Sequence, residues 1–246
     1  MLEQLRAARG VMRSLGIYYG HRHRAAAMDR LYRQFVNPGD LVFDIGAHVG
    51  DRVGAFRRIG ARVIAVEPQP ALAFTLGMLY GRKHDIVIER AAVGRASGEI
   101  GLMVNVDNPT ISTASTDFVR AATGAPGWEG QAWDKSIRVP MTTLDALIAQ
   151  HGVPAFIKID IEGFEEEALL GLTQPVQALS FEFTTIQRDI AHSCIKRCLA
   201  LGLSRFNAAL GESQELGEWR PAAAILHWLD ALPHTANSGD IYARLA

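Results

Sequence analysis

The chain has 246 residues, 48% of them hydrophobic, and a formal net charge of -1 at pH 7. This length and composition suit one large α/β domain, alone or with a small appendage. The nearly neutral charge and the lack of a long basic block argue against a nucleic-acid-binding protein. Because no apolar run has membrane-spanning length and the start has no signal-peptide pattern, we expect a cytoplasmic protein without an integral membrane segment.

Residues 1–36 are predicted to form an N-terminal helical arm of two helices, with a break between Gly16 and Gly20. Apolar residues recur at helical spacing in the second helix, Ala25–Phe35. An arm of this kind before the first strand often covers a ligand cleft, and we take that role as a hypothesis. The basic patch at residues 19–24 is more typical of a solvated face, although it can also meet an anionic substrate.

The first strand is predicted at Leu41–Ile45, a short apolar run that follows the turn signal Asn37-Pro38-Gly39-Asp40. Gly46 and Gly50 allow the backbone to turn sharply after the strand and to approach a ligand closely. The helix expected from about residue 50 to residue 58 points its free N-terminal amide groups at this turn. The segment is therefore a candidate ligand-binding loop.

The spacing of this loop narrows the choice of ligand. Its pattern G-x-x-x-G lacks the second glycine of the dinucleotide fingerprint G-x-G-x-x-G. Asp44, at the end of the strand, would repel a pyrophosphate but suits the amino group and the sulfonium of S-adenosylmethionine. The alternative is a plain strand-turn-helix of another α/β fold, because a fold alone does not fix a function.

From Leu41 onward, strand-like runs alternate with helical segments, which is typical of a parallel sheet with helices on both faces. The predicted strands span residues 41–45, 62–66, 85–90, 156–161 and 178–183, and the helices that follow span 50–58, 69–80, 163–170 and 190–201. Segments 203–207, 222–227 and 240–244 can supply two or three closing strands. We therefore expect an α/β fold with a doubly wound, mostly parallel sheet.

An insert at about residues 95–143 interrupts this alternation within the domain expected at residues 37–246. Residues 98–106 and 136–141 alternate apolar and polar side chains, as an added antiparallel pair would. The polar segment between them is long enough to be functional or disordered. Thr143 is then predicted to cap a helix over residues 144–150.

Two cysteines, Cys194 and Cys198, stand four residues apart on a predicted helix. No third cysteine or suitably placed histidine completes a metal-binding set, since His192 points elsewhere on that helix. We therefore expect reduced, structural thiols, which fits a reducing compartment.

Glu67 ends the second predicted strand. A doubly wound sheet places at this position the acid that binds ribose hydroxyls, and a carboxylate can accept a hydrogen bond from each of two neighbouring hydroxyls. The alternative is an ordinary surface glutamate before Pro68. The presence of Asp44 and the glycine loop upstream favours the ribose role.

Lys158, Asp160 and Glu162 alternate with three isoleucines in the strand predicted at residues 156–161, so their side chains are expected on one face. Burying these charges in a central parallel strand is costly unless they are paired. Such sheets bind ligands at their carboxyl edge. We therefore expect Asp160 and Glu162 to line a cleft, with Lys158 deeper and paired with one of them. An edge strand with a solvated face is the weaker alternative.

These motifs together resemble the signatures of FkbM-type S-adenosylmethionine-dependent methyltransferases. The segments that carry the resemblance are Phe43–Gly50, Val66–Pro68, Thr143–Asp145, Ile157–Gly163, Ser180–Phe183 and Gly239-Asp240. The resemblance extends from about residue 38 to the C-terminus. It implies a seven-stranded Rossmann-like sheet with an antiparallel final strand, and O-methylation of a hydroxyl on a small natural product or sugar-type acceptor. His48 stands where the family typically has Asn.

The resemblance also implies a site. The residues expected to hold S-adenosylmethionine are Asp44, Gly46, His48 and Gly50 at the methionyl part, Glu67 at the ribose, and Ala91 and Ala92 near the adenine. Removing the proton of an acceptor hydroxyl requires a base, and Asp160 or Glu162 is predicted to act as one. Lys158 is expected to tune that base or to stabilise the developing alkoxide. A proton-transfer role for His48 is an open alternative.

Three further alternatives follow from the same residues. Asp160, Glu162 and Glu182 could hold a divalent cation that lowers the pKa of a hydroxyl, although the sequence favours a site without metal. A non-catalytic protein that kept the S-adenosylmethionine pocket is the second alternative. An NAD-type oxidoreductase is the third, and the missing glycine fingerprint argues against it. The acceptor pocket is expected from the loop at 105–130, the N-terminal arm and the segment after residue 183.

Overall fold

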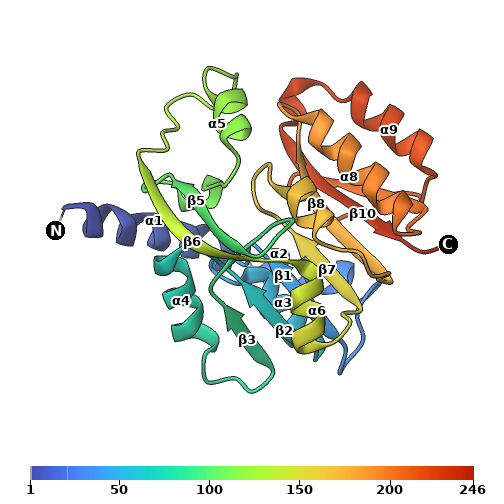
Figure 1. Cartoon of the computed structure of the whole chain (residues 1–246), viewed down its shortest axis with the longest axis horizontal. Coiled ribbons are helices and arrows are strands. Elements are labelled where there is room, and N and C mark those ends of the chain that lie inside the picture. The colour runs from blue at the N-terminus through green and yellow to red at the C-terminus, as the bar shows by residue number, and fades with distance from the viewer. Residues whose placement is uncertain (1, 21) are drawn as a thin grey trace.

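Seven strands form one sheet at the centre of the molecule, in the order β3-β2-β1-β7-β8-β10-β9. This computed structural model describes residues 2–20 and 22–246, with side chains described for 6–20 and 23–246 (Figure 1). The strands are β1 (Leu41–Ile45), β2 (Arg62–Val66), β3 (Ile86–Glu89), β7 (Phe156–Ile159), β8 (Ala178–Thr184), β9 (Arg205–Leu210) and β10 (Ser238–Arg244). β3, β2, β1, β7 and β8 pair in parallel, whereas β10 runs antiparallel to β8 and β9. The predicted Rossmann-like sheet with an antiparallel final strand is confirmed.

Helices cover both faces of this sheet and enclose two separate cores. α6 (Leu144–His151), α7 (Glu165–Leu170), α8 (Arg188–Ala200) and α9 (Ala222–Ala231) pack on one face, and α2 (Arg22–Tyr32), α3 (Asp51–Ile59) and α4 (Pro70–Tyr80) pack on the other. Successive strand residues point to opposite faces. Phe43 and Ile45 therefore enter the first core while Val42 enters the second. β1 and β7 are buried at every position, as central parallel strands usually are.

The insert forms a second, smaller sheet beside the first. Its strands are β4 (Ala92–Val93), β5 (Gly98–Val104) and β6 (Lys135–Thr142), in the order β4-β6-β5. β5 and β6 pair antiparallel, as their alternating pattern predicts. The segment between them contains the short helices η1 (Pro109–Ile111) and α5 (Thr116–Ala122). We did not predict α5, because its few apolar positions lie within a polar segment. The predicted cap of α6 is present, since Thr143 Oγ1 accepts a hydrogen bond from the Ala146 amide at 3.0 Å.

Of the three segments that could supply two or three closing strands, residues 222–227 do not form one, because they begin α9. Ile225 and Leu229 of α9 are buried four residues apart, which is helical spacing, and Pro221 precedes the first turn. A short apolar run fits a strand and a helix equally well, and here the helical period holds.

The strand expected at residues 156–161 ends earlier, at Ile159. The backbone turns after this point, and Glu162 adopts a left-handed conformation with φ of 55°. The alternation of charged and apolar residues therefore continues past the end of the strand. The expectation that Lys158, Asp160 and Glu162 share one strand face is wrong for this reason.

The N-terminal arm consists of α1 (Leu2–Tyr19) and α2. α1 contacts α4 and η1 beside the small sheet, and α2 packs on α3 (Figure 1). The first helix continues through Gly16 to Tyr19, so the break falls at Gly20, the last residue of the range predicted for it. His21 of the basic patch lies outside the described residues. Among the helices of the described chain, none is long and apolar enough to cross a membrane.

Cys194 and Cys198 lie on α8 as free thiols that are fully buried in the first core. His192 instead approaches Asp230, with 2.8 Å between Nε2 and Oδ1. The two cysteines therefore pack as small apolar side chains, in agreement with the structural role that the sequence predicts.

Candidate active site

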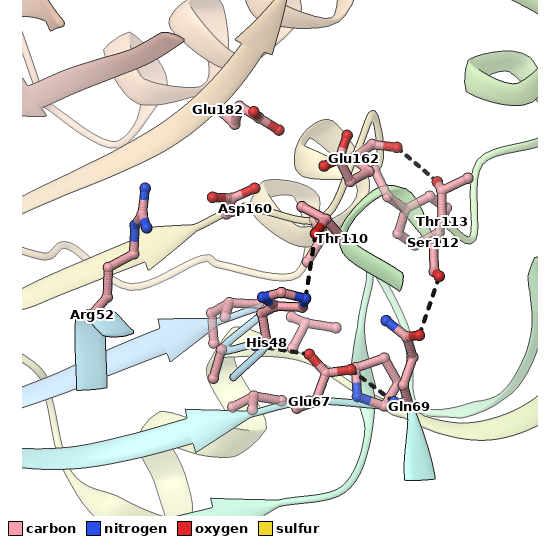
Figure 2. A pocket seen from close by; sticks show the side chains of 18 of the residues that line it. His48, Arg52, Glu67, Gln69, Thr110, Ser112, Thr113, Asp160, Glu162 and Glu182 are labelled. Carbon is pink, nitrogen blue, oxygen red and sulfur yellow. Dashed lines mark hydrogen bonds between the residues drawn. The ribbon is translucent and has the colours of Figure 1, made fainter. Parts of the chain in front are cut away.

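A cavity opens at the carboxyl ends of β1, β2 and β7, where sheets of this type bind ligands. It encloses about 1090 Å³ with its open mouth included. The loop after β1, the segment after β2, the end of β7 and the insert supply most of its walls (Figure 2). Its polar lining side chains are Tyr18, His48, Asp51, Arg52, Glu67, Gln69, Thr110, Ser112, Thr113, Asp160, Glu162, Glu182, Glu212, Ser238 and Asp240.

Gly46 brings the loop after β1 against the end of β7. Its φ of 81° is left-handed, and a Cβ atom there would lie 1.8 Å from the backbone oxygen of Asp160. Only glycine fits this contact without movement of the backbone. Gly50, at φ 85°, precedes α3, where a Cβ atom would lie 2.7 Å from Leu76 and Tyr80. Gly46 therefore lines the cavity, whereas Gly50 lies behind it and permits the packing of α4 on the loop.

Glu67 is fixed by two backbone amides at the end of β2. Oε2 accepts a hydrogen bond from the His48 amide at 2.9 Å, and Oε1 accepts one from the Gln69 amide at 2.8 Å. The residue is 3% exposed, and its burial raises the pKa of Glu67 to about 8. Each carboxylate oxygen has a second lone pair, so each can accept one further hydrogen bond from a ligand hydroxyl.

His48 has a left-handed backbone, with φ of 50°, and lines the cavity beside Glu67. Its ring meets Tyr18 of the N-terminal arm edge to face, with 5.3 Å between ring centroids. Nε2 lies 3.4 Å from Oγ1 of Thr110. Burial lowers the pKa of His48 to about 4, so the imidazole is neutral at pH 7. A neutral ring with this pKa is a weak base.

A chain of polar contacts joins Gln69 to the insert. Gln69 Nε2 donates to the Pro109 carbonyl at 3.0 Å. Ser112 Oγ donates to Gln69 Oε1 at 3.1 Å (Figure 2). Ala92 of β4 lines the same side of the cavity and packs with Leu102. We did not predict Gln69 or Ser112 as site residues. The only signal in the sequence is the position of Gln69 directly after Glu67-Pro68.

Asp44 lies beneath the cavity, not in its lining. It is 1% exposed, and neither carboxylate oxygen has a hydrogen-bond partner within the described chain. Burial raises the pKa of Asp44 to about 7, although the nearby charge of Arg52 opposes this change. The side chain therefore does not contact a ligand in the cavity directly.

Lys158 is fully buried and connects two carboxylates. Its Nζ lies 2.7 Å from Oδ1 of Asp240 on β10 and 3.2 Å from Oδ2 of Asp160. Burial lowers the pKa of Lys158, but Asp160 and Asp240 outweigh burial, so the net pKa is raised and the ammonium is retained. Lys158 thus lies deeper than Asp160 and is paired with it, as the sequence predicts, and Asp240 is a second partner.

Asp160, Glu162 and Glu182 converge on one side of the cavity (Figure 2). One oxygen from each carboxylate lies within 4.8 Å of the others. Burial and the charge of Asp160 hold the pKa values of Glu162 and Glu182 well above their usual range. Burial alone would also raise the pKa of Asp160, but Lys158 and Arg52 lower it overall. One ionised carboxylate therefore stands beside two that bind protons more tightly.

Arg52, on the first turn of α3, is a cavity residue that we did not predict. Its Nη1 lies 2.9 Å from Oδ2 of Asp51, and Nη2 lies 3.5 Å from Oε2 of Glu212. Arg24 of the arm approaches the same Glu212 oxygen at 2.8 Å and lies over the ring of Tyr18 at 4.8 Å. Arg52 thus lines the cavity beside the loop after β1, whereas Arg24 lies next to it, outside the lining.

The sequence profile of the methyltransferase FkbM domain matches residues 44–212, which include the loop after β1, Glu67 and all three carboxylates. The chain belongs to the FkbM methyltransferase family. This finding confirms the family that the motifs resemble and makes the chain a methyltransferase. It also agrees with the prediction of S-adenosylmethionine as the cofactor.

Several solved methyltransferases are similar to this FkbM-family chain in overall structure. The precorrin-6Y C5,15-methyltransferase of Geobacter metallireducens is 13% identical, with a TM-score of 0.42 over 91% of this chain and 87% of that chain. A TehB-like S-adenosylmethionine-dependent methyltransferase of Corynebacterium glutamicum is 11% identical, with a TM-score of 0.44 over 89% and 88% of the two chains. Aeropyrum pernix fibrillarin, solved with natively bound S-adenosyl-L-methionine, is 10% identical, with a TM-score of 0.45 over 85% and 68%. No curated protein matches the chain.

Most of the residues predicted for the FkbM-type site meet at one cavity. Those that line it are Gly46, His48, Glu67, Ala91, Ala92, Asp160 and Glu162, whereas Asp44, Gly50 and Lys158 lie behind its walls. The insert contributes Thr110, Ser112 and Thr113, and the arm contributes Tyr18, from two of the regions expected to form the acceptor pocket.

Proposed function

We propose that this chain transfers the methyl group of S-adenosylmethionine to a hydroxyl of a small acceptor, such as a natural product or a sugar-type molecule. The observation that carries the proposal is the position of Asp160, Glu162 and Glu182 in the cavity that also contains Glu67. One end of the cavity then offers oxygens that accept hydrogen bonds from the ribose hydroxyls. The other end offers a base for the hydroxyl of the molecule that receives the methyl group. Family membership supports the methyl transfer, and the carboxylates support oxygen as the methylated atom.

The donor and acceptor groups of the cavity fit S-adenosylmethionine. The cofactor supplies an electrophilic methyl group on a sulfonium. Glu67 would hold the ribose hydroxyls through the free lone pairs of its two fixed oxygens. Ala92 would border the adenine. His48 and Arg52 would donate hydrogen bonds to the methionyl carboxylate, helped by the N-terminal end of α3.

The neighbours of each carboxylate favour Glu162 as the base. Asp160 has a lowered pKa and already accepts a hydrogen bond from Lys158, so it is a weak base. Glu162 has a raised pKa, so its ionised form takes a proton more readily. We assign Lys158 to positioning, because it holds Asp160 and Asp240 and does not line the cavity. Asp44 and Gly50 would support the cofactor loop from behind.

Calorimetric titration with S-adenosylhomocysteine and with NAD tests the cofactor, and release of S-adenosylhomocysteine in the presence of hydroxylated acceptors tests the reaction. We expect micromolar affinity for S-adenosylhomocysteine alone and turnover with at least one acceptor of a panel that includes sugars and polyketide-type alcohols. Affinity for NAD would contradict the cofactor assignment. Turnover with amine acceptors alone would contradict oxygen as the methylated atom.

A further inference from the structure

The carboxylate cluster Asp160, Glu162 and Glu182 contains more negative charge than its buried lysine neutralises. Lys158 reaches Asp160 at 3.2 Å, but its other carboxylate partner, at 2.7 Å, is Asp240. No lysine or arginine of the described chain forms an ion pair with Glu162 or Glu182. Like charges this close are unfavourable unless protons or a cation compensate them.

The side chain of Glu162 gives a second, independent indication of a ligand. The residue is only 6% exposed, and its carboxylate has no hydrogen-bond partner among the described residues. The carboxylate points toward Asp160 and Glu182 across the cavity (Figure 2). Oε2 of Glu182 is also enclosed without a hydrogen-bond partner in the described part of the chain. A buried carboxylate without a partner is costly, so this arrangement favours a bound group that supplies positive charge.

We propose that Asp160, Glu162 and Glu182 bind a hard divalent cation of the Mg²⁺ or Mn²⁺ class at the acceptor end of the cavity. The three ligands are carboxylate oxygens, which these cations prefer, and the set contains no histidine or cysteine of the kind that favours Zn²⁺. At a metal–oxygen distance of about 2.1 Å, neighbouring ligands of octahedral Mg²⁺ lie about 3.0 Å apart and opposite ligands about 4.2 Å apart. At most one pair of three ligands is opposite, so the three oxygens, which lie within 4.8 Å of one another, must draw together by side-chain rotation when a cation binds.

The inference rests on the proposed function and narrows its substrate class. Three protein ligands leave about three positions of an octahedral cation for water and for the acceptor. An acceptor with two adjacent oxygens, such as a vicinal diol or a hydroxyl next to a carbonyl, would fill two of them. The cation would lower the pKa of the coordinated hydroxyl, and the free oxygen of Glu162 would accept its proton. The hydroxyl oxygen then bonds to the methyl carbon while the carbon–sulfur bond breaks, and the electron pair stays on sulfur.

Titration of the chelator-treated protein with Mn²⁺ tests the site without any acceptor. Free Mn²⁺ is followed by electron paramagnetic resonance, with and without S-adenosylhomocysteine. We expect one site in the wild-type protein, competition by Mg²⁺, and at least tenfold weaker affinity in Glu182→Gln and Glu182→Asp. The matched control is Glu218→Gln, at an exposed glutamate outside the cavity, which should bind Mn²⁺ like the wild type.

Circular dichroism of both Glu182 variants checks their fold, and Glu182→Asp retains the charge if the glutamine variant does not fold. Absence of a single Mn²⁺ site up to millimolar concentration, or equal affinity in a folded Glu182 variant, overturns the inference. If turnover continues in the presence of the chelator, the proposal of a metal site is overturned and the proposal of methyl transfer is retained. Mn²⁺ binding at this site without turnover of any acceptor would retain the metal and count against the proposed function.

Discussion

Both ends of the cavity contain buried carboxylates. The two ends differ in the hydrogen-bond partners that these carboxylates have. At the end that we propose for the cofactor, both oxygens of Glu67 already accept backbone hydrogen bonds, from His48 and Gln69. At the acceptor end, the carboxylate of Glu162 and one oxygen of Glu182 have no hydrogen-bond partner in the described chain. The cofactor end is therefore built before the ligand arrives, whereas the acceptor end is completed by a proton, a cation or the acceptor.

This difference indicates that ligand affinity and the chemical step depend on opposite ends of the cavity. A fixed carboxylate holds a ligand at low entropic cost, because its own orientation is already set. A carboxylate with a raised pKa and no partner can gain and lose a proton as the reaction requires. Variants at the two ends should therefore change different quantities, affinity at one end and turnover at the other.

The largest expected effect is that of Glu162→Gln on turnover. Loss of a general base typically lowers the rate by about 10²–10⁴-fold. The affinity for S-adenosylhomocysteine should stay within about threefold, because Glu162 belongs to the acceptor end. Release of S-adenosylhomocysteine under saturating cofactor measures the rate, and Glu218→Gln is the control.

The pH profile of wild-type turnover gives an independent check of the base. The pKa of Glu162 is raised, so its proton is still bound at moderately acidic pH. Turnover should therefore increase as the pH rises and Glu162 loses this proton. A rate that is flat from pH 5 to pH 9, with near-normal turnover in Glu162→Gln, would remove Glu162 from the reaction.

The next largest effect is expected from Gly46→Ala, at the contact between the two ends. The added Cβ would lie 1.8 Å from the Asp160 carbonyl at a left-handed φ. Backbone strain and overpacking together should cost about 2–6 kcal/mol of folding free energy. Gly39→Ala is a matched control, since Gly39 has φ of 89° but no atom within 4 Å of its Cβ position.

Chemical denaturation of both glycine variants separates strain from the clash. Gly39→Ala should show only the cost of the left-handed backbone, and Gly46→Ala should be less stable than Gly39→Ala. Equal stability of the two variants would mean that the loop moves freely away from β7. The two ends of the cavity would then be independent of each other.

A smaller effect is expected from Glu67→Gln, at the cofactor end. The glutamine amide would point an N–H group at the backbone amide of His48 or Gln69, and it would replace one of the two oxygens that accept hydrogen bonds from the ribose. Leaving a buried donor without its acceptor costs about 1–3 kcal/mol, so affinity for S-adenosylhomocysteine should fall about tenfold. Titration calorimetry measures this change. Unchanged affinity would place the ribose elsewhere in the cavity.

The sequence predicts the large sheet and the glycine-containing loop after β1 well, because local patterns determine both. The five parallel strands of the large sheet are short apolar runs with clear turn signals, and Gly46 and Glu67 follow directly from strand ends. The prediction fails where the period changes within a few residues. Residues 222–227 pack as a helix, and the charged alternation after Ile159 continues beyond the strand because the backbone turns at Glu162.

Contacts between distant segments lie outside the reach of these patterns. Arg52, Gln69 and Ser112 enter the site only because α3, the segment after β2 and the insert meet in space. Asp44 is the opposite case, since the loop pattern predicts a cofactor contact while the side chain is enclosed beneath the loop. Spacing along the chain fixes which residues are near a strand end, but not which way their side chains point.

The smallest expected effect is that of Asp44→Asn on the pH dependence of stability. Burial raises its pKa to about 7 from an ordinary value of 3.8, so the folded state binds this proton more tightly than the unfolded state. The contribution of Asp44 to stability is therefore fully present below about pH 4 and is lost as the pH rises toward about 7. Asp44→Asn removes this pH dependence. The melting temperature of the variant minus that of the wild type should therefore increase by several degrees between pH 4 and pH 8, since 1 kcal/mol of stability corresponds to roughly 2–4 °C.

Thermal melts of the wild type, Asp44→Asn and the exposed control Asp117→Asn across pH 4–8 measure this difference. Asp117 lies on α5 with its side chain 70% exposed, so its substitution should leave the pH dependence unchanged. If the Asp44→Asn difference is instead constant across this range, Asp44 is ionised in the folded protein. The charges of Arg52 and Lys158 would then outweigh its burial, and the cofactor end would contain a fixed negative charge beneath the loop that binds the methionyl group.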